Sequence, residues 1–258
     1  MMTKGTALIT GASSGIGAEL ARYFAKQQFD LVITARRKSN LDALATELGS
    51  SVNVTVVSCD LADSAGIEAL LTAVSEIEID VLVNNAGIAY SGNFQSQDEE
   101  TVLNLIHLNI IALTRLTHRL LPNMINRGMG RILNVASVAS FQPVPSLAAY
   151  AASKAYVLSL SESLSEELRG TGVSVTALCP GLTKTALLDE VQGFDVPMGI
   201  ASAPADVARE GYDALMKKEV IRVPGIANQA ALAWAKHQPR WLVRGIGGLV
   251  ARFNPNNH

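Results

Sequence analysis

The sequence is short of cysteine, of aromatic residues and of long hydrophobic runs. Among 258 residues there are two cysteines, and phenylalanine, tryptophan and tyrosine together make up 5%. Cys59 and Cys179 each stand at the end of an expected strand and are far apart in the sequence, which favours buried apolar side chains over a disulfide or a metal site. The histidines form no spaced cluster, so metal chemistry is not indicated.

Further absences limit where the protein acts and what it binds. No N-terminal segment joins basic residues to a long apolar stretch, and no run of about eighteen apolar residues occurs, so we expect neither a signal peptide nor a membrane span. These absences predict a cytoplasmic protein. The net charge of −2 argues against nucleic-acid binding as the main activity. With 48% hydrophobic and 17% charged residues, the chain can bury one sizeable core as a single α/β domain.

Short β-branched runs alternate with longer helical patterns, which is typical of βαβ units around a parallel sheet. Most expected strands are almost continuously apolar, so helices should cover both faces of the sheet. We expect strands at Thr6–Thr10, Leu31–Ala35, Val52–Ser58, Val81–Asn84, Arg131–Ala136, Ser174–Leu178 and Val220–Val223. We expect helices at Ile16–Lys26, Leu41–Leu48, Gly66–Glu76, Glu99–Arg127, Tyr150–Arg169 and Pro204–Lys217. Asp63 and Ser39 are suitable N-caps, and Pro204 can open its helix in the first turn.

Tyr150 and Lys154 are the most informative pair of residues. Residues four apart on a helix share one face, so this phenol and this ammonium can act together in acid–base chemistry. Ser137 and Asn109 precede them, and the glycine-rich segment Thr10–Gly17 directly follows an apolar, strand-like run. Together and in this order, these features resemble the short-chain dehydrogenase/reductase family.

The resemblance extends from about Thr6 to Val223. It implies a Rossmann-type, doubly wound α/β fold with a parallel sheet in the strand order 3-2-1-4-5-6-7. One NADP-binding and catalytic domain would span residues 1–225, and a basic and apolar tail would follow at 226–258.

The resemblance also gives each member of the catalytic group a role. Tyr150 would donate a proton to a carbonyl oxygen as hydride arrives from the nicotinamide, or remove one from the alcohol in the reverse direction. A free phenol has a pKa near about 10, so Lys154 and the positive ring of the oxidised cofactor would favour the phenolate, and Lys154 would also hold ribose hydroxyls. Ser137 would hydrogen-bond the substrate oxygen, and Asn109 would hold a water that links Lys154 to solvent. Taken singly, these residues have structural explanations: a buried ring, a solvated helix charge, a helix-entry serine and a mid-helix polar contact.

The glycine-rich turn predicts a phosphate site for the cofactor. Its glycines let the backbone turn sharply off the first strand and approach a pyrophosphate above a helix N-terminus. We expect cofactor contacts here from Gly11, Ser13, Ser14, Gly15, Ile16 and Gly17.

The end of the second strand indicates which dinucleotide is bound. Enzymes that use NAD usually place an acid here for the ribose hydroxyls, but this chain has Ala35 followed by Arg36 and Arg37. A guanidinium can form charge-assisted, forked hydrogen bonds to a 2′-phosphate, so Arg36 predicts NADP(H); a solvated loop charge is the alternative. Arg37 is expected at the surface.

Three further segments match the cofactor contacts of the family. Asp60 would hydrogen-bond the adenine amino group, although a loop or helix-cap role competes. Asn84 is expected to be structural, because its amide can tie neighbouring strands together, and Thr185 would bind the nicotinamide carboxamide. Tyr150 and Lys154 are also expected to contact the cofactor. The residues expected from the three segments are Asp60, Leu61, Asn85, Ala86, Gly87, Pro180, Gly181, Thr183 and Thr185.

The expected substrate walls, residues 138–146, 88–94 and 186–202, are mostly apolar or small. Such walls favour a lipophilic carbonyl compound over a sugar. Together with the resemblance, this predicts an NADP(H)-dependent oxidoreductase that interconverts a ketone or aldehyde and its alcohol. The resemblance further implies a homo-oligomer, either a dimer or a tetramer. A 3-oxoacyl-thioester reductase is the alternative enzyme, and an NADP-binding sensor or scaffold without turnover is the alternative outside the enzymes.

The C-terminal end differs in charge from the rest of the chain. From Val220 to His258 there are five basic residues and no aspartate or glutamate, which leaves −7 on the preceding residues because the whole chain carries −2. Trp234 and Trp241 stand among apolar residues here, while nearby glycines weaken a continuous helix. Three interpretations stay open: a subunit interface or a lid over the cleft, contact with an anionic membrane surface, and a loosely ordered end.

Overall fold

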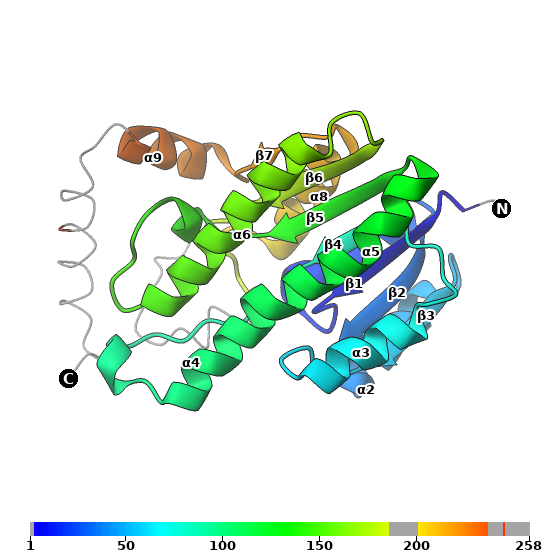
Figure 1. Cartoon of the computed structure of the whole chain (residues 1–258), viewed down its shortest axis with the longest axis horizontal. Helices are drawn as coiled ribbons and strands as arrows, with labels where there is room; N and C mark the ends of the chain where they lie inside the picture. The colour runs from blue at the N-terminus through cyan, green and yellow to red at the C-terminus, as the bar shows by residue number, and fades with distance from the viewer. Residues whose placement is uncertain (1–2, 186–200, 237–244, 246–258) are drawn as a thin grey trace.

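The structure is a computed structural model that describes residues 3–185, 201–236 and 245. Its centre is a sheet of seven parallel strands in the order β3-β2-β1-β4-β5-β6-β7, which confirms the predicted fold class and strand order (Figure 1). The strands are β1 (Thr6–Thr10), β2 (Asp30–Ala35), β3 (Val54–Ser58), β4 (Val81–Asn84), β5 (Gly130–Val135), β6 (Val173–Leu178) and β7 (Ile221–Arg222).

The chain changes direction across the sheet at β1. This strand pairs with β2 on one side and with β4 on the other, so β1 to β3 extend one way and β4 to β7 extend the other way. In a doubly wound sheet, the carboxyl ends of the strands at such a point leave a crevice for a ligand. The glycine-rich turn follows β1 at this edge.

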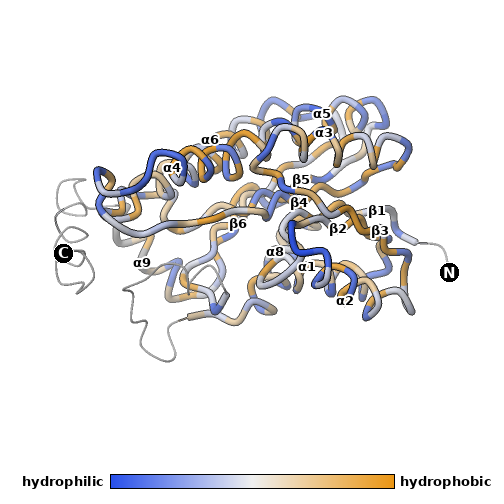
Figure 2. Tube along the Cα trace, turned by 90° about the horizontal axis from the view of Figure 1, so that it is seen from below, coloured by the Kyte–Doolittle hydropathy of each residue, from blue (hydrophilic) through white to orange (hydrophobic). Residues whose placement is uncertain are grey.

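Helices cover both faces of the sheet, as its apolar strands predict (Figure 2). One face carries α1 (Gly15–Lys26), α2 (Lys38–Leu48) and α8 (Pro204–Met216), and the other carries α3 (Ser64–Ala73), α4 (Glu99–Ile106), α5 (Leu113–Arg127) and α6 (Ala148–Glu167). Successive residues of a strand point to opposite faces. Ala7 and Ile9 therefore belong to the core under α1, whereas Leu8 between them belongs to the core under α3.

Two of the three predicted helix starts are confirmed. The Asp63 side chain accepts a hydrogen bond of 3.1 Å from the Ala65 N–H and caps α3, and Pro204 stands in the first turn of α8. Ser39 is not an N-cap, because α2 already begins at Lys38 and Ser39 lies inside it. The residue before α2, Arg37, makes no side-chain cap bond.

The predicted helix over residues 99–127 is present, but its hydrogen bonding is not α-helical throughout. A π-helical segment, η2 (His107–Ala112), lies between α4 and α5. Asn109 within it is 1% exposed and exchanges two hydrogen bonds of 2.9 Å with the backbone of Ile88, just beyond β4. A hydrophobic pattern indicates which face of a helix is buried and carries no sign of an extra residue in the hydrogen-bond ladder.

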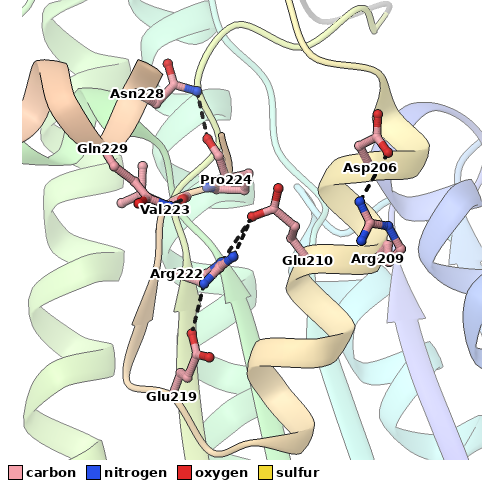
Figure 3. A network of polar contacts seen from close by, with 9 residues as sticks. All are labelled: Asp206, Arg209, Glu210, Glu219, Arg222, Val223, Pro224, Asn228 and Gln229. Atoms are coloured by element: carbon pink, nitrogen blue, oxygen red, sulfur yellow. Dashed lines mark hydrogen bonds and ion pairs between the residues drawn. The ribbon is translucent and has the colours of Figure 1, made fainter. Parts of the chain in front are cut away.

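The last described elements are β7 and α9 (Ile226–Lys236). Arg222 in β7 forms ion pairs with Glu210 at 2.9 Å and Glu219 at 3.6 Å (Figure 3). One of the five basic residues of the C-terminal end thus belongs to the domain and has its charge compensated. The predictions for Trp241 and the residues around it lie outside the described residues. None of the described helices is long and apolar enough to span a membrane.

Candidate active site

A cavity of about 520 Å³ lies at the carboxyl ends of the central strands. Every residue predicted for the site lines it, with two exceptions. Gly17 and Asn109 lie behind the wall, where each contacts residues that do line the cavity. The sequence motifs, which are spread over most of the chain, therefore meet at one place.

The glycine-rich turn has the backbone that the sequence predicts. Gly11 and Gly15 have φ angles of +67° and +57°, a conformation that favours glycine. A side chain on Gly17 would collide with the Gly11 carbonyl, so this glycine permits α1 to pack closely on the turn. Ser14, the N-cap of α1, makes no side-chain cap bond, and the first turn has no acidic residue. The N-terminal N–H groups of α1 are thus suited to an anion.

Both arginines after β2 line the cavity. The Arg36 guanidinium lies 3.9 Å from the Asp60 carboxylate, and the Arg36 side chain is 60% exposed. Arg37, expected at the surface, is exposed but reaches over the glycine-rich turn, where its guanidinium donates to the hydroxyls of Ser13 at 3.4 Å and Ser14 at 3.0 Å. Sequence reasoning missed this role of Arg37. In the sequence, Arg37 is marked only by its position beside Arg36, and this position does not indicate which of the two side chains turns toward the glycine-rich turn.

In the segment after β3, Asp60 has the loop role that the sequence left open, and its predicted contact with adenine stays a prediction. One carboxylate oxygen accepts a hydrogen bond of 2.9 Å from the Ala62 N–H, as in a loop role, and the residue also lines the cavity. Cys59 is a correction, because it is only half-buried, lines the cavity and has its sulfur 3.2 Å from the Thr34 hydroxyl. Cys179 is fully buried, as predicted.

Ser137, Tyr150 and Lys154 come together where β5 ends and α6 begins. The Tyr150 phenol is hydrogen-bonded to Ser137. Ser137 also accepts a hydrogen bond of 3.1 Å from the Ala139 N–H and so caps the short helix η3 (Val138–Phe141), which means that it is a helix-entry residue as well as a cavity residue. Lys154 is 5% exposed; its ammonium donates to the Val135 carbonyl at 2.8 Å and lies 5.8 Å from the centre of the Tyr150 ring.

Burial governs the acid–base properties of this group. It raises the pKa of Tyr150 above its usual value, while the hydrogen bond to Ser137 acts in the opposite direction. It lowers the pKa of Lys154 to about 8, because desolvation disfavours the ammonium, and the neighbouring Cys179 opposes this shift. The expectation that Lys154 and an oxidised cofactor together favour the phenolate stays a prediction; in this geometry, the ammonium donates to the Val135 carbonyl.

Two asparagines after and within β4 fix the framework of the site. The Asn84 amide donates to Asn134 at 2.9 Å and to Thr117 at 3.0 Å, which agrees with its predicted structural role between neighbouring strands. The Asn85 amide donates to the carbonyls of Thr10 at 2.9 Å and Gly11 at 3.2 Å, and so holds the glycine-rich turn against the end of β4.

Asn109 holds the catalytic helix to the same edge. Besides its bonds to Ile88, its amide donates to the Ser153 hydroxyl at 3.1 Å, next to Lys154. A side-chain carbon on Gly87 would lie 3.2 Å from the Asn109 oxygen and 3.3 Å from the Lys154 ammonium, so these three residues are in close contact.

The remaining wall is mostly apolar. It is formed by Ile88, Leu108, Val138, Val144, Leu147 and Leu182, with Gln142 as a polar member. Phe94, in the predicted wall 88–94, is 61% exposed and does not line the described cavity. Residues 186–200 of the third predicted wall lie outside the described residues.

Known proteins are similar to this chain in sequence and in fold. A family model described as short chain dehydrogenase matches residues 5–194. Ketoacyl reductase HetN from Nostoc sp. is 33% identical over 221 residues, which are 84% of this chain and 77% of that protein. A solved short-chain dehydrogenase from Sphingobium yanoikuyae in complex with NADPH has 37% identity and a TM-score of 0.82, over 90% of this chain and 93% of the other. The bulky-bulky ketone specific alcohol dehydrogenase from Comamonas testosteroni has 30% identity and a TM-score of 0.79, over 100% and 98% of the two chains.

Proposed function

This chain belongs to the short-chain dehydrogenase family of oxidoreductases, and on this premise we propose that it uses NADP(H) to interconvert a bulky, lipophilic ketone or aldehyde and its alcohol. The observation that carries the proposal is the position of the Tyr150 hydroxyl. It is hydrogen-bonded to Ser137 at the end of β5, in an apolar-walled cavity. Arg36 and Arg37 line the same cavity at the end of β2, three strands away across β4 and β1.

The residues at the β1 side fit a phosphorylated dinucleotide. The glycine-rich turn and the N-terminus of α1 suit a pyrophosphate. Ala35 carries no charge that would repel a 2′-phosphate, and Arg36 and Arg37 line the same end of the cavity, where either guanidinium could pair with one. Arg37 already donates to the Ser13 hydroxyl of the turn. Asp60 and Leu61 would flank the adenine, and Thr183 and Thr185 the nicotinamide end. When bound, the cofactor supplies or accepts the hydride.

The chain itself handles the proton. Tyr150, whose raised pKa keeps the phenol protonated at neutral pH, donates its proton to the carbonyl oxygen of the substrate. Ser137 hydrogen-bonds the same oxygen as negative charge develops on it. The Lys154 ammonium stabilises the phenolate that remains. Asn109 joins the Ile88 backbone to Ser153, the residue before Lys154, and would take part in proton replacement through water.

The apolar wall supports a lipophilic substrate, because few polar groups are present to pair with the hydroxyls of a sugar. The similarity to an alcohol dehydrogenase specific for bulky-bulky ketones is in line with this choice. A 3-oxoacyl-thioester reductase is the second candidate, favoured by the similarity to a ketoacyl reductase. A sensor without turnover is disfavoured because the whole catalytic group is assembled.

A carbonyl panel with NADPH oxidation as the signal tests these candidates. The panel contains bulky aryl and alicyclic ketones, short aldehydes and acetoacetyl-CoA as a 3-oxoacyl thioester. We expect the highest kcat/KM with a bulky ketone. A higher value with the thioester would replace the first candidate by the second, and NADPH binding without turnover of any compound would favour the sensor.

We also propose that the chain forms a homo-oligomer through the outer face of α4, η2 and α6. Leu103, Ile111 and Tyr156 are 47%, 36% and 38% exposed there, and a contact of 3.0 Å between Tyr156 and Thr114 joins α6 to α5. Light scattering should give a dimer or a tetramer, and Ile111→Glu should lower the mass.

A further inference from the structure

One amide of α9 reaches the wall of the cavity. Gly181 follows Pro180 in the turn after β6 and lines the cavity. A side-chain carbon on Gly181 would lie 2.5 Å from both terminal atoms of Asn228 and 2.7 Å from its Cγ. Gly181 is not among the glycines with a positive φ. Glycine is therefore needed here because Asn228 occupies the space of a side chain.

Asn228 is itself held in place. Its amide nitrogen donates to the Pro224 carbonyl at 2.8 Å, and the neighbouring Gln229 amide donates to the Val223 carbonyl at 2.8 Å (Figure 3). The strand just before this loop is fixed by the ion pair of Arg222 with Glu210. Asn228 can therefore not yield to a side chain on Gly181 without losing its bond to Pro224 or displacing the start of α9.

The turn that Asn228 contacts is connected to the catalytic group. The Pro180 carbonyl accepts a hydrogen bond of 2.9 Å from the Val138 N–H, the residue after Ser137. The Gly181 carbonyl accepts one of 3.0 Å from the Thr183 hydroxyl, which also lines the cavity. A shift of this turn would therefore move the backbone beside Ser137 and the threonines at the nicotinamide end.

We propose that Asn228 is a positioning residue that fixes the Pro180–Gly181 turn, and that Gly181 and Asn228 form a size-matched pair through which α9 sets the geometry of the reaction. The inference rests on the proposed function for its kinetic consequences. Its steric part concerns only the contact between the two residues and can be measured without turnover.

A double-mutant cycle tests the pair in the full chain. The variants are Gly181→Ala, Asn228→Ala and their combination, each measured for kcat and KM with the best ketone, for the Kd of NADPH and for Tm. Because a misplacement of about 1 Å can cost about 10²-fold in rate, we expect Gly181→Ala to lower kcat about ten- to a hundredfold. Asn228→Ala alone should lower kcat severalfold while the Kd of NADPH stays within about threefold. Adding Asn228→Ala to Gly181→Ala should return kcat to within about threefold of Asn228→Ala alone.

Gln229→Ala is the matched control. It removes a side-chain hydrogen bond of the same length to the same loop, and Gln229 is not among the nearest atoms to a side chain on Gly181. It should not rescue Gly181→Ala. Equal damage by Gly181→Ala with and without Asn228 would overturn the proposal and would place the need for glycine on the cofactor side. An unchanged kcat in Asn228→Ala would overturn the positioning role.

The experiment separates failure of this inference from failure of the proposed function. If the unaltered chain reduces no carbonyl compound, the function fails, and the cycle is then decided by NADPH Kd and Tm. A Gly181→Ala protein that folds only when Asn228→Ala is also present supports the size-matched pair. A loss of Tm that Asn228→Ala does not reverse contradicts it.

Discussion

Removal of both arginines after β2 should abolish the preference for NADPH over NADH. Arg36 and Arg37 line the same end of the cavity, and a charge-assisted hydrogen bond contributes about 1.5–3 kcal/mol. The Arg36 side chain is 60% exposed, so solvent and salt screen part of its interaction, and about 1.5 kcal/mol, close to tenfold, is the expected loss in Arg36→Ala.

Arg37 changes the design of the experiment. Its guanidinium already reaches Ser13 and Ser14, and it can exchange these hydroxyls for phosphate oxygens. A single Arg36→Ala protein would therefore keep part of its preference. We expect about a hundredfold loss in the ratio of kcat/KM for NADPH to that for NADH in the double variant, and a further shift toward NADH when Ala35→Asp is added, because the carboxylate can pair with ribose hydroxyls.

The assay is initial-rate reduction of one saturating ketone with each nucleotide, at low and at high salt. Arg209→Ala is the matched control, since this arginine is 52% exposed, pairs with Asp206 on α8 and lies outside the cavity lining. A nucleotide ratio that stays within twofold in the double variant would refute the reasoning and make both arginines surface charges. So would a ratio that does not fall with salt.

Three further predictions concern the catalytic group. Tyr150→Phe should abolish turnover, while the Kd of NADPH, measured by fluorescence titration, stays within a few-fold of the unaltered protein. Near-normal turnover would contradict the role of Tyr150 as proton donor. The kcat of reduction should fall as pH rises through about 8, because Lys154 loses its charge there while Tyr150 keeps its proton. A flat pH–rate profile would contradict this. Lys154→Ala should lower activity and NADPH affinity, and the fall in kcat near pH 8 should disappear. Asn109→Leu should lower the free energy of unfolding in urea by about 2–4 kcal/mol, because the Ile88 N–H and carbonyl lose their partners in a buried place, and a loss below about 0.5 kcal/mol would contradict that accounting.

The sequence predicts the sheet well because its signals are local. Continuous apolar runs indicate strands covered on both faces, and the glycine-rich turn indicates where the first strand ends, so β1 appears at its predicted bounds and the order of the sheet is confirmed. Features that depend on tertiary contacts could not be predicted in this way. Within the π-helical segment, the buried Asn109 amide is hydrogen-bonded to the Ile88 backbone, and the sequence around neither residue indicates this partner.

The same distinction applies to the site. The motif residues could be predicted because each class of chemistry requires a particular side chain at a particular strand end. Whether Arg36 or Arg37 turns over the loop depends on the start of α2, and the contact between Gly181 and Asn228 joins residues from two separate elements. Ser137 has both of the roles that the sequence offered as alternatives, because its hydroxyl caps η3 and is also hydrogen-bonded to Tyr150.

Burial also gives the catalytic pair a preferred direction. The raised pKa of Tyr150 keeps its proton in place at neutral pH, as carbonyl reduction requires, and Lys154, with a pKa of about 8, is still mostly charged there and can stabilise the phenolate that forms. Oxidation of an alcohol begins from the phenolate. A pH high enough to form that phenolate also removes the charge of Lys154 that would stabilise it. The environment that makes the pair an effective acid therefore makes it a weak base, unless the positive ring of the oxidised cofactor outweighs burial. We therefore expect this protein at neutral pH to reduce carbonyl compounds faster than it oxidises the corresponding alcohols.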